Sequence, residues 1–340
     1  MTDQPNRRRF LQSSVAAGLS LALADKVLSA QKDTGTGIPK RPLGNSGADV
    51  SILCLGGWHI GQAGKDDGDP AAIKLMHEAI DNGMTFFDNC WDYHDGYSEE
   101  LMGKAIHDRR DKVFLMTKVC NRDYEGAKAN LDDSLKRMQT DHLDLWQFHE
   151  MVYDNDPDWV FEKGGIRAAL EAQKAGKVKH IGFTGHKDPA IHLKMLNKPY
   201  QWASAQMPIN VCDYFFRSFL HQVLPQCLKQ NTGVLGMKSL GGGVEGKIPA
   251  SGLVSAKECI HFSLSQPISS LVVGLRNQRD LTQALEVGRD FKPLTLEQQA
   301  AILEKIKDPS GDGRHELFKT SKEFDGPYHR KQHGFEVGMT

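Results

Sequence analysis

Three apolar segments of the sequence each end in a side chain that can hold or move a proton. These side chains are the carboxylate of Asp88, the ammonium of Lys118 and the imidazole of His149, and the phenol Tyr93 follows Asp88 by five residues. If the segments are neighbouring strands of a parallel barrel, their C-terminal ends open onto one face, where the loops build active sites. The order of these residues therefore predicts that all four side chains meet in one cavity.

The four side chains together are suited to protonating a carbonyl oxygen. A phenol with a reference pKa of about 10 is a poor acid at neutral pH. The ammonium of Lys118 is expected to lower the pKa of Tyr93, while Asp88 fixes the position of the lysine. His149 can donate a hydrogen bond to the same substrate oxygen. Each residue has ordinary structural roles, but these give no reason for three adjacent strands to end in this way, so the pattern predicts proton transfer coupled to hydride transfer.

A regular alternation of β-rich and helical segments surrounds these residues. Strands are expected at residues 50–55, 85–88, 113–118, 143–149, 178–184, 202–206, 234–238 and 271–274. Helices are expected at residues 70–82, 99–107, 125–138, 159–175, 189–196, 219–231, 255–265, 280–288 and 296–306. A hairpin of residues 40–43 and 50–55 comes first. The order predicts an α/β fold, a (β/α)8 TIM barrel closed at the bottom by the hairpin. A doubly wound open sheet is the alternative, but no G-x-G-x-x-G motif opens the first helix.

Length and composition limit the classes of function. The chain of 340 residues carries 42 Lys+Arg and 43 Asp+Glu without a long basic stripe, so no nucleic-acid partner is expected. No stretch approaches the ~20 apolar residues of a membrane span. The six cysteines contain no CxxC pair, so neither a disulfide framework nor a Cys-rich zinc or iron–sulfur site is predicted. Cys90 and Cys120, two residues beyond Asp88 and Lys118, are expected to be packing thiols rather than redox partners.

The first thirty residues have the features of a signal peptide. Residues 7–9 are arginines, an apolar run follows at 15–23, and a small-x-small pattern at 22–24, or a poorer one near 30, offers a cleavage site. The segment with the arginines, residues 6–12, resembles a twin-arginine (Tat) signal, which predicts export to the periplasm by the Tat machinery. The alternative is a basic N-terminal helix on a cytosolic enzyme. The predicted organisation is a signal peptide at 1–30, a linker at 31–37, the barrel at 38–306 and a C-terminal tail at 307–340.

Three motifs resemble those of the aldo-keto reductase family. Residues 40–44 (KRPLG) are similar to the family's opening hairpin, residues 87–93 (FDNCWDY) to its Asp-and-Tyr signature, and residues 98–103 (SEELMG) to the helix start that follows. The resemblance implies an NAD(P)(H)-dependent oxidoreductase that interconverts a carbonyl (aldehyde, ketone or sugar) and an alcohol, with a small-molecule substrate. The implied catalytic residues are Tyr93, the general acid/base, with Asp88, Lys118 and His149.

The resemblance also implies a nicotinamide cofactor and the residues that hold it. The implied cofactor residues are Gly57, Trp58, Asp88, His186, Gln206, Met237, Lys238, Leu240, Gly241, Gly242, Gly274, Arg276 and Gln278. Arg276, with Arg279 as a second candidate, fits a charge-assisted contact to the adenosine 2′-phosphate, so NADP(H) is favoured over NAD(H). The implied substrate residues are Trp58, Tyr93 and His149.

Two other classes of function stay open from the sequence. The sequence departs from the family pattern at His186, Met237 and Ala284. These departures suggest, as an alternative, a non-catalytic nucleotide-sensing or partner-binding protein on the same barrel. A barrel metal-hydrolase would use Asp88, Asp92, His94, His149 and Glu150, although Lys118 among them would repel a cation. The sequence does not distinguish a sugar substrate from an aromatic carbonyl. The candidate contacts for either substrate are Trp58, Trp91, Tyr153 and Trp159.

Overall fold

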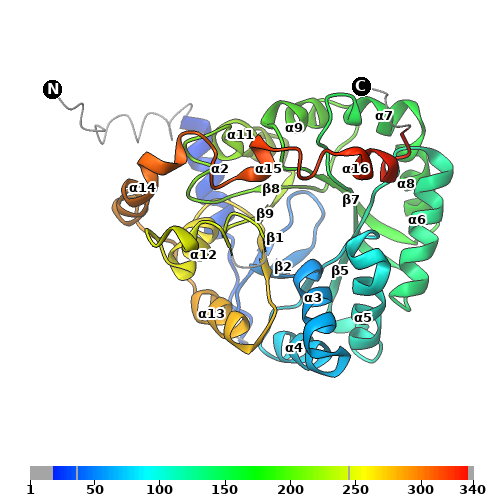
Figure 1. The fold of residues 1–340 in the computed structure, drawn as a ribbon, viewed down its shortest axis with the longest axis horizontal. Helices are drawn as coiled ribbons and strands as arrows, with labels where there is room; N and C mark the ends of the chain where they lie inside the picture. Colours follow the sequence, from blue (N-terminus) through cyan, green and yellow to red (C-terminus); the bar gives the residue numbers. More distant parts are fainter. Residues whose placement is uncertain (1–17, 36, 244–245, 336–340) are drawn as a thin grey trace.

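A closed barrel of eight parallel strands forms the centre of the molecule (Figure 1). The computed structural model describes residues 18–35, 37–243 and 246–335, so the predicted arginine run at 7–9 lies outside the described residues. The barrel strands are β3 (Leu53–Gly56), β4 (Phe86–Asp88), β5 (Phe114–Val119), β6 (Leu143–Phe148), β7 (Val178–Thr184), β8 (Ser204–Pro208), β9 (Gly233–Met237) and β10 (Ser270–Gly274). Strand β10 pairs with β3, which closes the ring and confirms the predicted (β/α)8 barrel.

The predicted hairpin is present, but its second strand is separate from the barrel. Strands β1 (Lys40–Pro42) and β2 (Asp49–Ser51) pair antiparallel, whereas residues 50–55 were expected to form one continuous strand. The chain bends after Ser51, whose hydroxyl donates to the carbonyl oxygen of Leu53 and accepts from the backbone N–H of Phe86. Because Val50 packs into the apolar cluster inside the barrel, the hairpin covers the end of the barrel opposite the strand C-termini.

Helices surround the barrel on all sides (Figure 1). They are α3 (Gly57–Asp67), α4 (Asp69–Asp81), α5 (Tyr97–Ile106), α6 (Tyr124–Arg137), α7 (Asp156–Glu162), α8 (Gly165–Lys174), α9 (Pro189–Leu196), α10 (Phe219–Gln222), α11 (Leu224–Gln230), α12 (Ala256–Leu264), α13 (Gln278–Gly288) and α14 (Leu296–Ser310). The prediction of one helix at 159–175 was wrong, because Gly164, with φ 92°, separates α7 from α8. The helix expected at 219–231 is also two, since Pro225 in the first turn of α11 cannot continue α10.

Helix α3 follows β3 directly and was not predicted, because its glycines weaken the helical signal. One of them, Gly61, faces the short 3-10 turn η1 (Tyr93–Gly96), and a Cβ at Gly61 would lie 2.3 Å from the His94 ring. The glycine therefore allows a close approach that helix propensity alone disfavours. This approach sets the position of the turn that begins with Tyr93.

Both ends of the described chain pack on the barrel. Helix α2 (Gly18–Ser29) contacts α11 and β1, and the Gln31 side chain donates to the carbonyl oxygen of Phe291. The tail, with α15 (Leu317–Thr320) and α16 (Pro327–Gln332), crosses the strand C-termini, as the red segment in Figure 1 shows. Its anchor is the buried ammonium of Lys319, which lies 2.7 Å from Asp213 Oδ1 and 2.8 Å from Glu316 Oε2.

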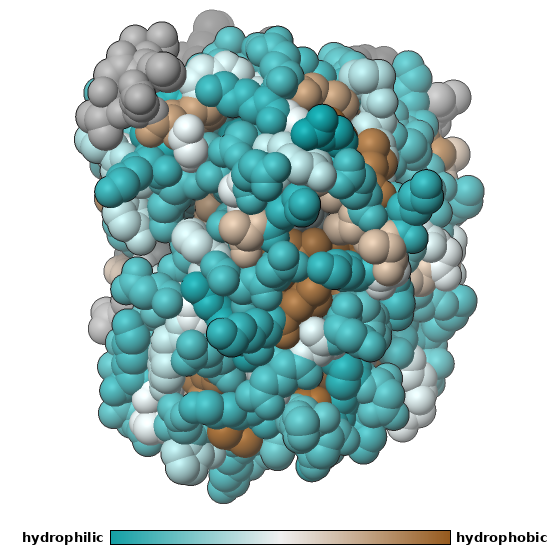
Figure 2. All heavy atoms as spheres, turned by 90° about the vertical axis from the view of Figure 1, so that its right-hand side faces the viewer, coloured by the Kyte–Doolittle hydropathy of each residue, from teal (hydrophilic) through white to brown (hydrophobic). Residues whose placement is uncertain are grey.

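The outer surface is mainly hydrophilic on the face that Figure 2 shows, where hydrophobic residues form small separate groups. Within the described residues, no helix combines the length and the apolar character needed to cross a membrane.

We expect His192, on α9, to make stability depend on pH. Its buried ring lies with Nε2 3.1 Å from the carbonyl oxygen of Gln206, and burial lowers the pKa of His192 from 6.5 to about 4. The unfolded chain protonates His192 more readily than the folded protein does. The contribution of the neutral His192 to the unfolding free energy is therefore complete above pH 6.5 and is lost as the pH falls toward 4. We expect His192 to remove ~3 kcal/mol of unfolding free energy over this range. Urea unfolding should show a weaker pH dependence for His192→Gln, and equal dependence in both proteins would contradict this.

Candidate active site

An ion pair between Lys118 and Asp88 lies at the C-terminal end of the barrel. Both side chains are almost completely buried, and Lys118 Nζ also donates to the carbonyl oxygen of Asn89 at 2.7 Å. The hydroxyl of Tyr93 lies 3.4 Å from the same Nζ, and the ammonium stands 4.8 Å from the centre of the phenol ring. Strands β4 and β5 and the turn η1 thus bring three of the predicted residues into direct contact.

The predicted lowering of the Tyr93 pKa is not found. Burial raises the pKa of Tyr93 well above its usual value, and the carboxylate of Asp88 adds to this rise. The prediction was wrong because it weighed the charge of Lys118 without the charge that neutralises it. Burial by itself opposes a charged lysine, yet Asp88 raises the pKa of Lys118 and keeps the ammonium protonated. The phenol is therefore held in its neutral form, which is the form that can donate a proton.

His149 completes the predicted group from the end of β6. Its ring lies edge-on to the Tyr93 ring, with 5.7 Å between the ring centres. Burial lowers the pKa of His149 well below its ordinary value, and the charge of Lys118 lowers it further. The imidazole is accordingly neutral. Its Nδ1 faces two thiols, Cys90 Sγ at 3.0 Å and Cys120 Sγ at 3.7 Å, which leaves Nε2 as the nitrogen available to a ligand.

A cavity of ≈ 710 Å³ opens above this group. Tyr93, Lys118, Asp88 and His149 all line it. So do most of the predicted cofactor residues, namely Trp58, His186, Gln206, Met237, Lys238, Leu240, Gly242, Gly274 and Arg276. The cavity wall does not include Gly57, Gly241 and Gln278. Of the four aromatic residues considered for the substrate, only Trp58 lines the cavity. Trp91 instead donates to Asp133, Tyr153 to the backbone of Asp325, and Trp159 packs on Phe335.

The floor of the cavity presents polar atoms that fit a carboxamide. His186 Nε2 and Gln206 Oε1 are buried and have no hydrogen-bond partner among the described residues. Burial, together with the nearby Lys238, lowers the pKa of His186 well below its ordinary value, so its ring offers one donor and one acceptor. Buried polar groups are normally satisfied, so these atoms indicate where a polar ligand group binds. The residues present thus fit a nicotinamide at this position.

The other end of the cavity carries a cation. Arg276 follows β10 and its side chain is 28% exposed, beside the carboxylate of Asp280 at 3.9 Å. Arg279 is exposed and does not line the cavity. Arg276 is therefore a cation that can reach an anionic group of a bound nucleotide, and Lys65 also lines the cavity.

The tail supplies cavity residues that the sequence analysis missed. Glu323, Phe324, Tyr328 and His329 all line the cavity. Phe324 packs against the His186 ring, with 4.9 Å between the ring centres, and Lys238 Nζ lies 4.7 Å from the centre of the Phe324 ring. The tail has little periodicity, and its aromatic residues were the only available signal.

The residues considered for a metal-hydrolase do not assemble into one set. Asp88 is paired with Lys118, and His94 Nε2 lies 2.8 Å from the carbonyl oxygen of Trp58. Glu150 faces the tail, with Oε2 3.9 Å from His329 Nε2. These partners occupy groups that the hydrolase would need as ligands.

A buried ion pair positions a phenol beside a neutral imidazole, and a long cavity opens here at the mouth of the (β/α)8 barrel. Together these features define an oxidoreductase of carbonyl and alcohol groups. Comparison with known proteins agrees with this class. The model of the aldo/keto reductase family matches residues 52–247, and the chain belongs to this family.

Individual relatives cover different shares of the chain. The uncharacterized oxidoreductase YrpG of Bacillus subtilis is 36% identical over 162 residues, which is 41% of this chain and only 47% of YrpG. L-galactose dehydrogenase of Arabidopsis thaliana is 25% identical over 319 residues, covering 81% of this chain and 98% of that enzyme. A solved aldo/keto reductase from Klebsiella pneumoniae, in complex with NADP and acetate, has the same fold, with a TM-score of 0.63, 20% identity, and coverage of 77% of this chain and 93% of that one.

Proposed function

We propose that the protein is an NADP(H)-dependent reductase of sugar or other small carbonyl compounds, with Tyr93 as the proton donor. The observation that carries this proposal is the contact of the Tyr93 hydroxyl with Lys118 Nζ, at 3.4 Å, in the wall of the cavity. When bound, the nicotinamide supplies the hydride that the carbonyl carbon receives. No observation favours a non-catalytic binding protein on the same barrel.

The chain's own residues account for the proton in this proposal. Tyr93 holds it on the phenol oxygen and donates it to the substrate oxygen as negative charge develops there. Lys118 stabilises the phenolate that results, and Asp88 keeps the ammonium in place. His149 Nε2 donates a hydrogen bond to the same substrate oxygen, so that the two donors orient the carbonyl before reaction.

The walls near Tyr93 support a polyhydroxylated substrate. Trp58 and Tyr328 offer flat apolar faces, while Glu150 and His329 offer hydrogen bonds. This mixture suits the faces and hydroxyl groups of a sugar, and L-galactose dehydrogenase is a relative that matches most of the chain.

Initial rates with NADPH and with NADH test the proposed function. We expect turnover with NADPH on a panel of sugars and sugar-derived carbonyls, above the turnover on apolar aromatic aldehydes of similar size. Faster turnover of the aromatic aldehydes would contradict the sugar assignment alone. Absence of turnover on the whole panel, in either direction and with either cofactor, would contradict the proposed activity.

Arg276 is proposed to hold the 2′-phosphate that distinguishes NADPH from NADH. A charge-assisted hydrogen bond contributes about 1.5–3 kcal/mol, so Arg276→Ala should raise the KM for NADPH by about 10–100-fold. The KM for NADH should change little, because NADH lacks this phosphate. The matched control is Arg279→Ala, which removes an exposed arginine outside the cavity. Equal losses with both cofactors would place the phosphate elsewhere.

We further propose that the protein is exported by a Tat-type signal. The support is the order of arginines, apolar run and small residues in the first thirty residues. If so, Arg7→Lys/Arg8→Lys should retain the protein in the cytoplasm. Fractionation checks this, and unchanged export of the variant would contradict the proposal.

A further inference from the structure

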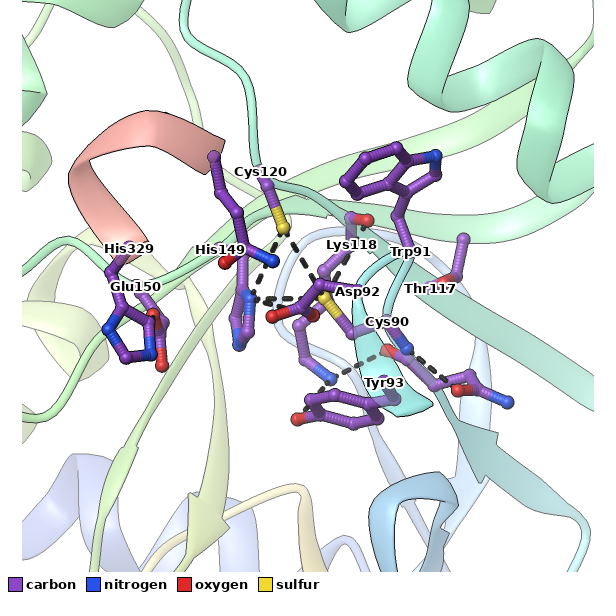
Figure 3. Close-up of polar contacts among 12 residues, drawn as sticks. Cys90, Trp91, Asp92, Tyr93, Thr117, Lys118, Cys120, His149, Glu150 and His329 are labelled. Atoms are coloured by element: carbon purple, nitrogen blue, oxygen red, sulfur yellow. Dashed lines mark hydrogen bonds and ion pairs between the residues drawn. The ribbon is translucent and has the colours of Figure 1, made fainter. Parts of the chain in front are cut away.

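Four metal-binding side chains meet beside the candidate active site, although they are scattered in the sequence. They are Cys90, Asp92, Cys120 and His149, and one ligand atom from each lies within 4.8 Å of all the others. Figure 3 shows the two sulfur atoms and the Asp92 carboxylate grouped around one nitrogen of His149. They come from the loop after β4, the loop after β5 and the end of β6. The absence of a CxxC pair had argued against such a site.

Three of the distances between the ligand atoms are close to those of tetrahedral coordination. With ~2.3 Å from zinc to sulfur and ~2.0–2.2 Å to nitrogen or oxygen, neighbouring ligand atoms lie about 3.3–3.8 Å apart. Cys90 Sγ lies 3.9 Å from Cys120 Sγ, and His149 Nδ1 lies 3.7 Å from Cys120 Sγ and 3.6 Å from Asp92 Oδ1. The separation of 3.0 Å between Cys90 Sγ and His149 Nδ1 must widen, and all four ligand atoms lie within 4.8 Å of one another.

The Asp92 carboxylate gives an independent indication of a ligand. Its Oδ1 atom is buried and has no hydrogen-bond partner among the described residues. A buried carboxylate oxygen without a donor is costly, and a coordinated cation would satisfy it. The thiols of Cys90 and Cys120 beside it are also buried. The four side chains together offer the soft sulfur donors and the harder nitrogen and oxygen donors of a mixed metal site.

The backbone around these residues is already held in place. Arg122 is buried, and its guanidinium donates to the carbonyl oxygens of Cys120, at 2.8 Å, and of His149, at 2.6 Å. The same side chain pairs with the buried Asp156. Outer contacts of this kind orient the ligands of metal sites. Two thiolates and one carboxylate around a divalent cation leave a net charge of −1, next to Lys118 and Arg122, which already pair with Asp88 and Asp156.

We propose that Cys90, Cys120, His149 and Asp92 form a closed tetrahedral zinc site that fixes the orientation of His149. Binding forms four coordinate bonds and releases the two thiol protons to water, and no electron is transferred. With Nδ1 on the ion, the imidazole proton resides on Nε2, the nitrogen proposed to meet the substrate oxygen. The ion has no open position, so its role is structural rather than that of a Lewis acid.

Metal content tests this proposal independently of turnover. The full-length protein, reduced, incubated with Zn²⁺ and desalted, should retain about one zinc per chain. Cys90→Ala/Cys120→Ala should retain almost none. Cys227→Ala/Cys259→Ala, which removes two other buried thiols, should bind as the unmodified protein does. Zinc-free protein after reduction and incubation, or zinc retained in Cys90→Ala/Cys120→Ala, would overturn the site.

Cobalt keeps the test decisive if the variants do not fold. Co²⁺ bound to the unmodified protein should give thiolate charge-transfer absorption and the strong visible bands of a tetrahedral site. Spectra of an octahedral oxygen site would overturn the proposal. A Cys90–Cys120 disulfide is the rival, detected as a mass lower by two hydrogens before reduction. If the reduced protein then still takes up no metal, the cysteines are a redox pair and not zinc ligands.

Discussion

Replacing Tyr93 by Phe is expected to lower kcat by about 10²–10⁴-fold, the usual contribution of a positioned general acid. The phenol oxygen lies 3.4 Å from Lys118 Nζ, and Phe removes that oxygen while keeping the ring. Substrate binding changes less, because the ring still fills the cavity wall, so KM should rise only a few-fold. Steady-state kinetics on the best substrate of the panel measures both constants.

Tyr97→Phe is the matched control for this prediction. Tyr97 is a second phenol, four residues further along the chain, and its hydroxyl donates to Asp69 at 2.6 Å outside the cavity. Its loss should leave kcat within a factor of about two, since no reacting atom is touched. If Tyr93→Phe retains as much turnover as the control Tyr97→Phe, the proton comes from another group.

Breaking the buried ion pair is expected to be the most destabilising single change at the site. Asp88→Asn leaves the ammonium of Lys118 buried without its counter-charge, which typically costs about 3–5 kcal/mol of unfolding free energy. The variant should also lose turnover, because Lys118 is no longer held under the phenol. Urea unfolding and steady-state kinetics measure the two effects separately.

The double variant separates charge from position. Asp88→Asn/Lys118→Met removes both charges, so it should recover most of the stability while turnover stays lost. Lys104→Met, which breaks an exposed pair with Asp69, is the control and should cost only ~0–1 kcal/mol. A double variant as unstable as Asp88→Asn would mean that packing, and not the unpaired charge, carries the effect.

The fold could be predicted because its signals are local. Each strand is a short apolar run, and several helices repeat apolar residues at spacings of three and four, so the order of elements was readable along the chain. The misses are local as well. The glycines of α3 weaken the helical pattern, so that helix was not predicted. Gly164 divides one expected helix into two through its positive φ, and the sequence pattern does not reveal this φ.

The sequence by itself determined that Asp88, Lys118 and His149 end neighbouring strands, because strand ends in a parallel barrel share one face. Tertiary structure alone decided three other properties. Burial, which depends on all neighbours at once, raised the pKa of Tyr93 where charge pairing alone had suggested the opposite. The tail lines the cavity and is anchored by Lys319, which pairs with Asp213 in a distant segment and with the nearby Glu316. Cys90, Asp92 and Cys120 gather around His149 because loops that are far apart in sequence leave adjacent strands.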